Sequence, residues 1–210
     1  MTDVFVKVWA SSRMRLAMAW AVVERLAMIP SANVRIIYAY PSHRLGLSIG
    51  DLGSETWAIA RSAVVLRGEN FWVTSKQYAE DQAESPIYVV IDDDHLPIGR
   101  TWLEDGVSAL EAHPEFSMLS SWSINGEVPA NNTGTHDPDV FEVVNLGTPY
   151  FVRKGALRTL PAGDDGGAAT YDGILSDHVR KQGRIGFLRR CRHNHLGCGY
   201  SQVVSGHWSA

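Results

Sequence analysis

The sequence predicts an α/β fold, an αβα sandwich in which helices cover both faces of a mostly parallel central sheet. Residues 4–9 form a β-type run, apolar residues recur at helical spacing over 16–27, and residues 34–40 form a second β-type run. This order is a βαβ unit, which builds parallel sheets. Residues 86–91 are continuously apolar, as in a strand that is covered on both faces. A chain of 210 residues suits one domain.

The remaining elements follow the same alternation of helix and strand. Further helices are expected over 55–66, 75–84, 102–113 and 172–182, and further strands over 116–122, 141–152 and 184–189. Residues 123–138 are polar and without periodicity, which indicates a loop. Because sites in such sheets lie beyond the carboxyl ends of the strands, we look for chemistry there.

Composition and charge exclude several classes of protein. Nineteen Lys and Arg residues against 23 Asp and Glu residues give a net charge of -4, which disfavours a bulk electrostatic grip on nucleic acid. The longest apolar stretch, 16–29, is broken by Glu24 and Arg25 and is too short to span a bilayer. The first residues include Asp3 and Lys7, so no signal-peptide core is visible. We therefore expect a cytoplasmic protein without a membrane span.

Three consecutive aspartates, Asp92, Asp93 and Asp94, directly follow the apolar strand. Like charges this close raise one another's pKa and oppose folding, so a compensating cation is expected. Mg²⁺ or Mn²⁺ is the natural candidate, since either binds one or two carboxylates together with the phosphates of a nucleotide. In an extended segment Asp92 and Asp94 point the same way and could share the metal, which leaves Asp93 for another partner. The alternative is a solvated acidic turn.

Two motifs carry a resemblance to a known family. The segment PIYVVIDDDHLP (86–97), followed by a helix from Trp102, resembles the DxD region of nucleotide-sugar glycosyltransferases with the GT-A fold. The similarity is to the large inverting family 2, which includes cellulose and chitin synthases. The segment YDGILSDHVRKQG (171–183) is similar to the family's second motif, a pair of acids and a helix that ends in Gly. Tyr171 replaces the first acid, and Asp172 keeps the second.

The resemblance implies that Asp172 is the general base that deprotonates an acceptor hydroxyl. A carboxylate at a helix N-terminus suits this chemistry independently. The alternative is that Asp172 is a plain N-cap. The resemblance also implies that a histidine after the last strand completes the metal site, and His195 fits the spacing better than His193. A zinc site made by the Cys and His residues of 191–198 is the rival interpretation.

The resemblance implies a nucleotide pocket at the loop after the first strand, formed by Ala10, Ser11 and Arg13. The family's acid at the end of the second strand is absent, and Tyr40, which could stack on a base, stands there. Lys76 occupies the place of the family's Arg-Asn pair and would contact the diphosphate. Arg61 is the alternative because a guanidinium matches phosphate bidentately.

The resemblance also implies an acceptor side. Asn145 and Thr148 lie in the stretch that lines the sugar-acceptor face in the family, and Asp93 would contact the ribose or the donor sugar. Trp102 and Trp122 are further candidates for stacking on a sugar ring. On this interpretation the whole chain is one glycosyltransferase domain. Residues 1–95 form its Rossmann-like nucleotide-binding half, and 96–210 form its acceptor-binding half.

The expected activity is metal-dependent, inverting transfer of a sugar from a nucleoside diphosphate sugar, with a UDP-sugar favoured, to a hydroxyl acceptor. The acceptor could be a glycan, a protein, a small molecule or a modified nucleic-acid base. One rival is a nucleotidyltransferase, which usually carries a Gly-rich basic loop after its first strand, and 10–15 lacks glycine. The other is a non-catalytic sugar-nucleotide binding module.

Overall fold

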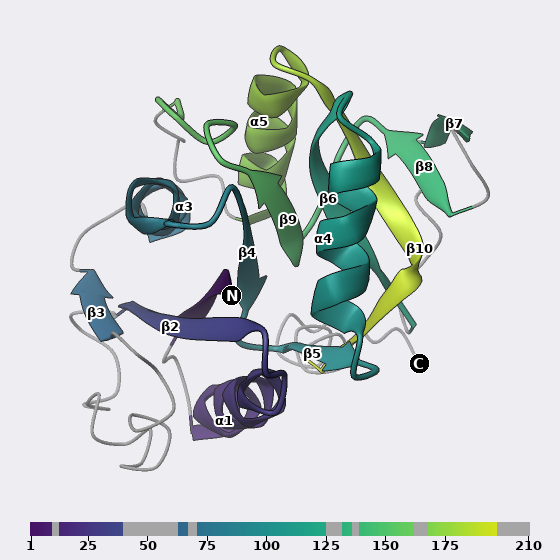
Figure 1. The fold of residues 1–210 in the computed structure, drawn as a ribbon. Helices are drawn as coiled ribbons and strands as arrows, with labels where there is room; N and C mark the ends of the chain where they lie inside the picture. Colours follow the sequence, from purple (N-terminus) through teal and green to yellow (C-terminus); the bar gives the residue numbers. More distant parts are fainter. Residues whose placement is uncertain are drawn as a thin grey trace, which may run out of the picture.

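A computed structural model describes residues 1–9, 13–39, 63–66, 71–124, 132–135, 139–161 and 168–196. Its centre is one sheet with the strand order β3-β2-β1-β4-β9-β6-β10-β8-β7, and β5 pairs with β10 beside this path. From β3 to β10 every strand except β9 runs in the same direction. The predicted α/β sandwich with a mostly parallel sheet is therefore confirmed (Figure 1).

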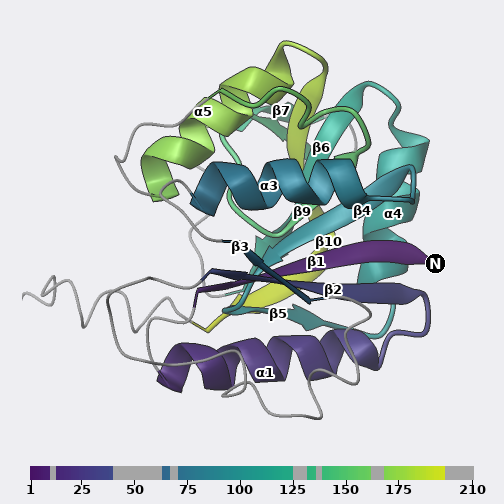
Figure 2. The ribbon, with the colours of Figure 1, turned by 90° about the vertical axis from the view of Figure 1, so that its left-hand side faces the viewer.

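The first half of the chain builds the parallel part of the sheet. It consists of β1 (Thr2–Trp9), α1 (Arg13–Ala27), β2 (Ala32–Ala39), β3 (Ala63–Leu66), α3 (Phe71–Gln82) and β4 (Ile87–Asp92). β1 lies between β2 and β4, and its six inner residues are all buried. Figure 2 shows α1 and α3 on opposite sides of these strands. The predicted opening βαβ unit is thus present.

The second half extends the sheet with mixed pairing. It contains β5 (His95–Ile98), α4 (Trp102–Ala112), β6 (Phe116–Ser123), β7 (Asn132–Thr135), β8 (Val140–Val143), β9 (Tyr150–Arg153), α5 (Ala168–Arg180) and β10 (Arg184–His195). One hydrophobic core contains residues of α1 and α4, and the other contains residues of α3 and α5. Among the described residues, two helices therefore pack on each face of the sheet.

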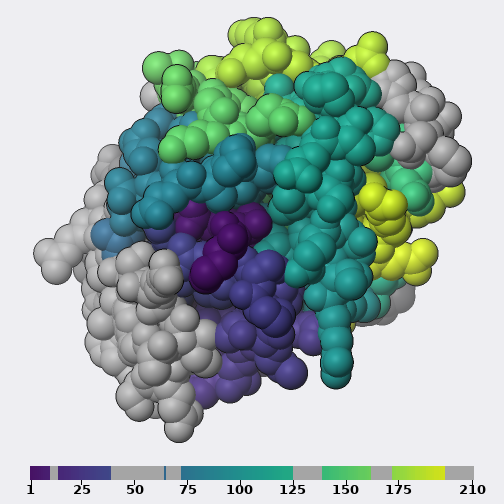
Figure 3. All heavy atoms as spheres, in the orientation of Figure 1, coloured from purple at the N-terminus to yellow at the C-terminus, as the bar shows by residue number. Residues whose placement is uncertain are grey.

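The space-filling view shows the face at which the chain begins (Figure 3). The first residues, in purple, are enclosed there by segments from the α3 and α4 parts of the chain. No helix in the described part of the chain is both long and apolar enough to cross a membrane.

Several elements differ from the sequence-based expectation. The helix expected over 55–66 is wrong at its end, where Ala63–Leu66 pairs with β2 as a strand, in keeping with its two valines. The strand expected over 141–152 is two strands, β8 and β9, because the segment between them contains Gly147 and Pro149. β7 lies within the expected polar loop, β5 was not anticipated, and β10 continues six residues past Arg189.

Candidate functional site

The site lies where the carboxyl ends of β1 and β4 meet the turn that follows β4. β4 ends at Asp92, and a two-residue turn, Asp93 and Asp94, leads into β5. β5 pairs antiparallel with β10, and its first residue, His95, stands opposite His195. The pairing of β5 with the last strand therefore brings together residues about one hundred positions apart in the sequence.

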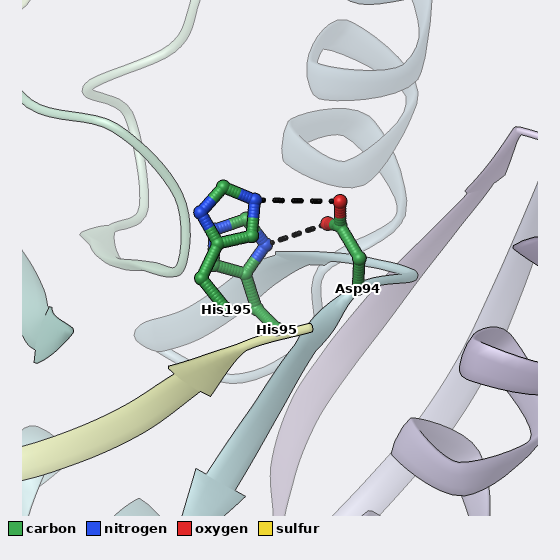
Figure 4. Close-up of side chains that lie close together, drawn as sticks. All are labelled: Asp94, His95 and His195. Carbon is green, nitrogen blue, oxygen red and sulfur yellow. Dashed lines mark ion pairs between the residues drawn. The ribbon is translucent and has the colours of Figure 1, made fainter. Parts of the chain in front are cut away.

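Asp94, His95 and His195 form a cluster whose ligand atoms all lie within 4.8 Å of one another. The Oδ1 atom of Asp94 is 2.9 Å from His95 Nδ1, and its Oδ2 atom is 3.4 Å from His195 Nε2. The two imidazole rings stack, with centroids 4.2 Å apart, and Figure 4 shows both rings on one side of the carboxylate. His95 was missed in the sequence, where it is the residue directly after the aspartates.

The chemistry of this cluster fits a divalent metal ion. Burial alone would raise the pKa of Asp94, but hydrogen bonds from His195 and His95 and the charge of Arg15 hold it far below its usual value. The carboxylate is therefore ionised, as a metal ligand must be. One carboxylate with two imidazoles suits Mn²⁺ better than Mg²⁺, which prefers oxygen ligands.

His193, the alternative ligand, has a different environment. Its Nδ1 atom is 2.6 Å from the hydroxyl of Ser121, and its ring lies 4.9 Å from that of His95. Burial, with the nearby charges of His95 and His195, lowers its pKa to about 2, so it is neutral. Cys191, in the rival zinc interpretation, instead donates its thiol to the carbonyl of Trp102. Among the described residues, the possible metal-binding cluster therefore includes His195, as the resemblance implied. It includes neither His193 nor Cys191.

Asp92 has other partners than the cluster. Its Oδ1 atom is 2.5 Å from Lys7 Nζ, and its Oδ2 atom accepts a 2.6 Å hydrogen bond from the hydroxyl of Thr148. Burial would raise the pKa of Asp92, but Lys7, His95 and Lys76 lower it to about 2. Asp92 and Asp94 do not share a face because the extended backbone ends at Asp92. Thr148, expected on the sugar-acceptor face, is thus bonded to the acidic segment.

Arg15 in α1 holds the other two aspartates. Its Nη2 atom is 2.7 Å from Asp93 Oδ1, and its Nη1 atom contacts Asp94 Oδ2. The backbone N–H of Trp9 donates to Asp93 Oδ2 at 2.8 Å, so Asp93 is tied to the end of β1. The chain itself thus supplies Lys7 and Arg15 to offset the acidic run. Sequence reasoning missed both, although Lys7 is the one charged residue in the run VFVKVW.

Asp172, the expected base, lies one turn inside α5, which begins at Ala168. The N-cap interpretation of Asp172 is therefore wrong, because the residues before it continue the helix backwards. The hydroxyl of Tyr150 donates to Asp172 Oδ1 at 2.7 Å. Burial raises the pKa of Asp172, and the charge of Lys76, this hydrogen bond and the charge of Lys7 only partly offset the rise.

Lys76 lies in α3 with 1% of its surface exposed. Burial and the charge of Lys7 lower its pKa to about 7, against the opposing charges of Asp172 and Asp92. Its Nζ atom is 5.7 Å from the ring centres of both Trp72 and Tyr150. The structure therefore places Lys76 within electrostatic reach of Asp172 and Asp92. Its contact with a diphosphate stays a prediction.

The other sequence-based candidates are scattered or not described. Ala10, Ser11, Tyr40 and Arg61 lie outside the described residues, and Arg13 begins α1 with a side chain that is also outside them. Asn145 is exposed. Trp102 is 1% exposed and packs on Phe151 in the core, so it is not available to a sugar. Trp122 is half-buried beside Phe141.

No protein-family model matches the sequence, and no curated protein is a significant match. Solved structures do match the fold. S. aureus TarS 1–349 aligns with a TM-score of 0.65 at 14% identity, over 92% of this chain and 59% of that one. The same TarS fragment in complex with UDP-GlcNAc aligns at 0.63, with 15% identity, over 94% of this chain and 61% of that one.

Two further structures broaden the comparison. The mannosyltransferase PcManGT from Pyrobaculum calidifontis, in complex with GDP-Man and Mn²⁺, aligns at a TM-score of 0.61 and 12% identity, over 93% of this chain and 56% of that one. A UDP-glucose pyrophosphorylase complexed with UDP-glucose aligns at 0.59 and 11% identity, over 90% of both chains. This chain therefore has a GT-A-like fold.

Proposed function

We propose that the chain is a glycosyltransferase that moves a sugar from a nucleoside diphosphate sugar to a hydroxyl acceptor, with inversion and with a divalent metal ion. The observation that carries the proposal is that the carboxyl edge of the sheet contains two distinct sets of side chains. One is the metal-ligand set of Asp94, His95 and His195. The other is the half-buried carboxylate of Asp172, with its raised pKa, which lies outside that set.

In this reaction Asp172 accepts the proton of the acceptor hydroxyl as the acceptor oxygen bonds to the anomeric carbon. The bond from that carbon to the diphosphate breaks, and the nucleoside diphosphate leaves with the electron pair. A raised pKa suits a base that must hold a proton near neutral pH. Mn²⁺, held by Asp94, His95 and His195, would offset the negative charge of the diphosphate. Lys76 and Lys7 add positive charge beside Asp92.

The donor follows from the fold and its neighbours. TarS and the pyrophosphorylase were solved with UDP-GlcNAc and UDP-glucose, which favours a UDP-sugar, and the mannosyltransferase was solved with GDP-Man. The residues expected to bind the nucleotide sugar are Ala10, Ser11 and Arg13, together with Asp93. Trp9 and Trp72 stack at the end of β1, with ring centres 6.0 Å apart, which supports an apolar wall there.

The test is release of nucleoside diphosphate from UDP-GlcNAc, UDP-glucose and GDP-mannose with Mn²⁺ and a panel of hydroxyl acceptors. We expect Asp172→Asn to lower kcat by about 10²- to 10⁴-fold, as for loss of a general base. Asp177→Asn is the matched control, because Asp177 lies on the same helix and is exposed. Full transfer by Asp172→Asn would refute the assignment, and NMR of the product's anomeric proton would test inversion.

A nucleotidyltransferase is the second candidate, favoured by the pyrophosphorylase alignment over 90% of both chains. Such an enzyme would convert a UDP-sugar and pyrophosphate into UTP and a sugar 1-phosphate without any hydroxyl acceptor. We expect no UTP from this chain under those conditions. Formation of UTP that depends on pyrophosphate would replace the transferase proposal, and donor binding without any turnover would favour a binding module.

A further inference from the structure

We propose that Tyr150 is a positioning residue that fixes the carboxylate of Asp172 and selects which of its oxygens takes the acceptor proton. The inference rests on the proposed role of Asp172 as the base. Tyr150 is fully buried at the start of β9, and its hydroxyl donates to Asp172 Oδ1 at 2.7 Å. A short hydrogen bond to a half-buried carboxylate limits the rotation of that carboxylate.

The segment that carries Tyr150 is hydrogen-bonded both to the acidic segment after β4 and to α5. The hydroxyl of Thr148, two residues earlier, donates to Asp92 Oδ2 at 2.6 Å. One segment thus bonds Asp92 at the end of β4 and Asp172 on α5. Any movement of Asp172 relative to the aspartates after β4 must break one of these two hydrogen bonds.

Two more hydrogen bonds hold the same segment from its amino side. The backbone N–H of Leu146 donates to the hydroxyl of Ser176 on α5, at 3.0 Å. The carbonyl of Gly147 accepts from the hydroxyl of Ser120 on β6, at 2.8 Å. Both hydroxyls belong to fully buried residues. The segment 146–150 is therefore attached to three elements, and Tyr150 can transmit that rigidity to Asp172.

The hydrogen bond from Tyr150 occupies Oδ1 of Asp172 and leaves Oδ2 to accept a proton. A Cβ built on Gly147 would lie 3.9 Å from Asp172 Oδ2, so a glycine next to this oxygen leaves space that a side chain would fill. An acceptor hydroxyl can enter this space, and its proton then passes to Oδ2 as its oxygen bonds to the sugar. Oδ1 keeps its hydrogen bond from Tyr150 throughout.

Charged groups from every neighbouring element bear on Asp172. Lys76 of α3 and Lys7 of β1 favour its ionised form, and Asp92 of β4 opposes it. The hydroxyl of Tyr150 also favours the ionised form, against the effect of burial. The centre of the Tyr150 ring lies 5.7 Å from Lys76 Nζ, and a phenylalanine ring at this position would keep this cation–π contact. Tyr150→Phe therefore removes the hydroxyl together with its hydrogen bonds to Asp172 Oδ1, at 2.7 Å, and to the carbonyl of Leu146, at 3.3 Å, and it leaves the lysines in place.

The test compares two buried tyrosines that each donate a hydrogen bond to a carboxylate, half-buried in Asp172 and buried in Glu80. Tyr150→Phe is the test variant. Tyr88→Phe is the control, because the hydroxyl of Tyr88 donates to Glu80 at 2.9 Å and neither residue belongs to the cluster. Carbon-13 NMR of the aspartate carboxyl groups, assigned with Asp172→Asn, gives the pKa of Asp172 in each protein. We expect Tyr150→Phe to raise this pKa by about one unit, the size of a hydrogen bond to a charged group, and Tyr88→Phe to leave it unchanged.

Kinetics supply the second readout. In Tyr150→Phe the acid limb of the kcat profile should move to higher pH by the same amount, with the donor KM unchanged. If both variants lose stability alike and the Asp172 pKa stays at its original value, Tyr150 is structural and the inference fails. If the protein transfers no sugar at all, the proposed function fails, whereas the NMR shift still decides the contact.

A second variant covers the case in which Tyr150→Phe does not fold. Ser176→Ala removes only the hydrogen bond to the backbone of Leu146 and leaves the Tyr150 side chain intact. It should raise the Asp172 pKa by less than Tyr150→Phe would, because the segment loosens while the hydroxyl remains. An unchanged pKa in this variant would count against the positioning role.

Discussion

The carboxylates at the two edges of the sheet differ in the share of their hydrogen bonds that comes from the backbone, although Asp3 also binds the side chains of Asn33 and Arg35 and Asp93 also accepts the backbone N–H of Trp9. At the amino edge, Asp3 Oδ2 accepts hydrogen bonds from the backbone N–H groups of Glu84 and Ser85, at 2.7 and 3.0 Å. At the carboxyl edge, Asp92 is bound instead by the side chains of Lys7 and Thr148. Backbone donors cannot turn away from a carboxylate without local unfolding, whereas side chains can.

Glu80 repeats the pattern of the amino edge. It is 2% exposed, and the backbone N–H groups of Gly155 and Leu157 donate to it at 2.6 and 3.0 Å. Asp94 repeats the pattern of the other edge, with Arg15, His95 and His195 around it. The comparison indicates that the carboxylates of the amino edge stabilise the fold. At the carboxyl edge, side chains surround Asp92 and Asp94, and Asp93 also accepts the backbone N–H of Trp9.

The largest effect is expected where a buried cation is removed from its carboxylate partner. Lys7 is 2% exposed, and Lys7→Met would leave the Asp92 carboxylate, which is 17% exposed, without this ion pair. We expect the free energy of unfolding to fall by about 3 to 5 kcal/mol, the usual cost of breaking a buried ion pair. Urea denaturation at pH 7 measures it.

The double variant Lys7→Met with Asp92→Asn is the control, since it removes both charges. It should recover most of the lost stability, because a neutral pair leaves no uncompensated charge. Equal stability of Lys7→Met and the natural protein would mean that this ion pair is not a structural element of the carboxyl edge.

At the amino edge the effect of one substitution is smaller but depends on pH. Burial would raise the pKa of Asp3, but hydrogen bonds from Ser85, Glu84 and Asn33 and the charge of Arg35 lower it below 3.8. Its stabilising effect is therefore complete above about pH 4 and is lost as the pH falls further. We expect Asp3→Asn to cost about 2 kcal/mol at pH 7, in line with hydrogen bonds to a charged group.

Urea denaturation of the two proteins between pH 7 and pH 2.5 checks this prediction. The difference between them should shrink on acidification, because the natural Asp3 also becomes protonated. Asp81→Asn, at an exposed position on α3, should show a difference close to zero throughout. A difference for Asp3→Asn that does not change with pH would contradict the role of its charge.

Much of the fold was predictable because its signals are local. The opening βαβ unit and β4 follow from periodicity and from runs of apolar residues, and the chemistry of the aspartates follows from their position after β4. The short strands β3, β5 and β7 were not predictable, because four residues carry little periodicity and depend on partners far away in the sequence.

The candidate site was predictable only in part for the same reason. Asp94, His195 and Asp172 stand in motifs, but His95 joins the first two only through the register of β5 against β10. Lys7 interrupts an apolar strand, which marks it as unusual in the sequence. Its ion pair with Asp92, however, forms only because β1 and β4 are adjacent in the sheet. Tyr150 carries no local signal, because a buried tyrosine in a strand is ordinarily a packing residue.

The smallest effect concerns His95, one of the residues of the carboxyl edge that only the structure identified. His95→Gln should weaken Mn²⁺ binding at least about tenfold, or about 1.4 kcal/mol, since Asp94 and His195 remain as ligands. Electron paramagnetic resonance of free Mn²⁺, titrated without nucleotide, measures this affinity. His113→Gln is the control, because His113 follows α4 beside Glu115. If His193→Gln weakened binding more than His95→Gln, the ion would lie on the other side of the stacked rings, and the carboxyl edge would need a different ligand set.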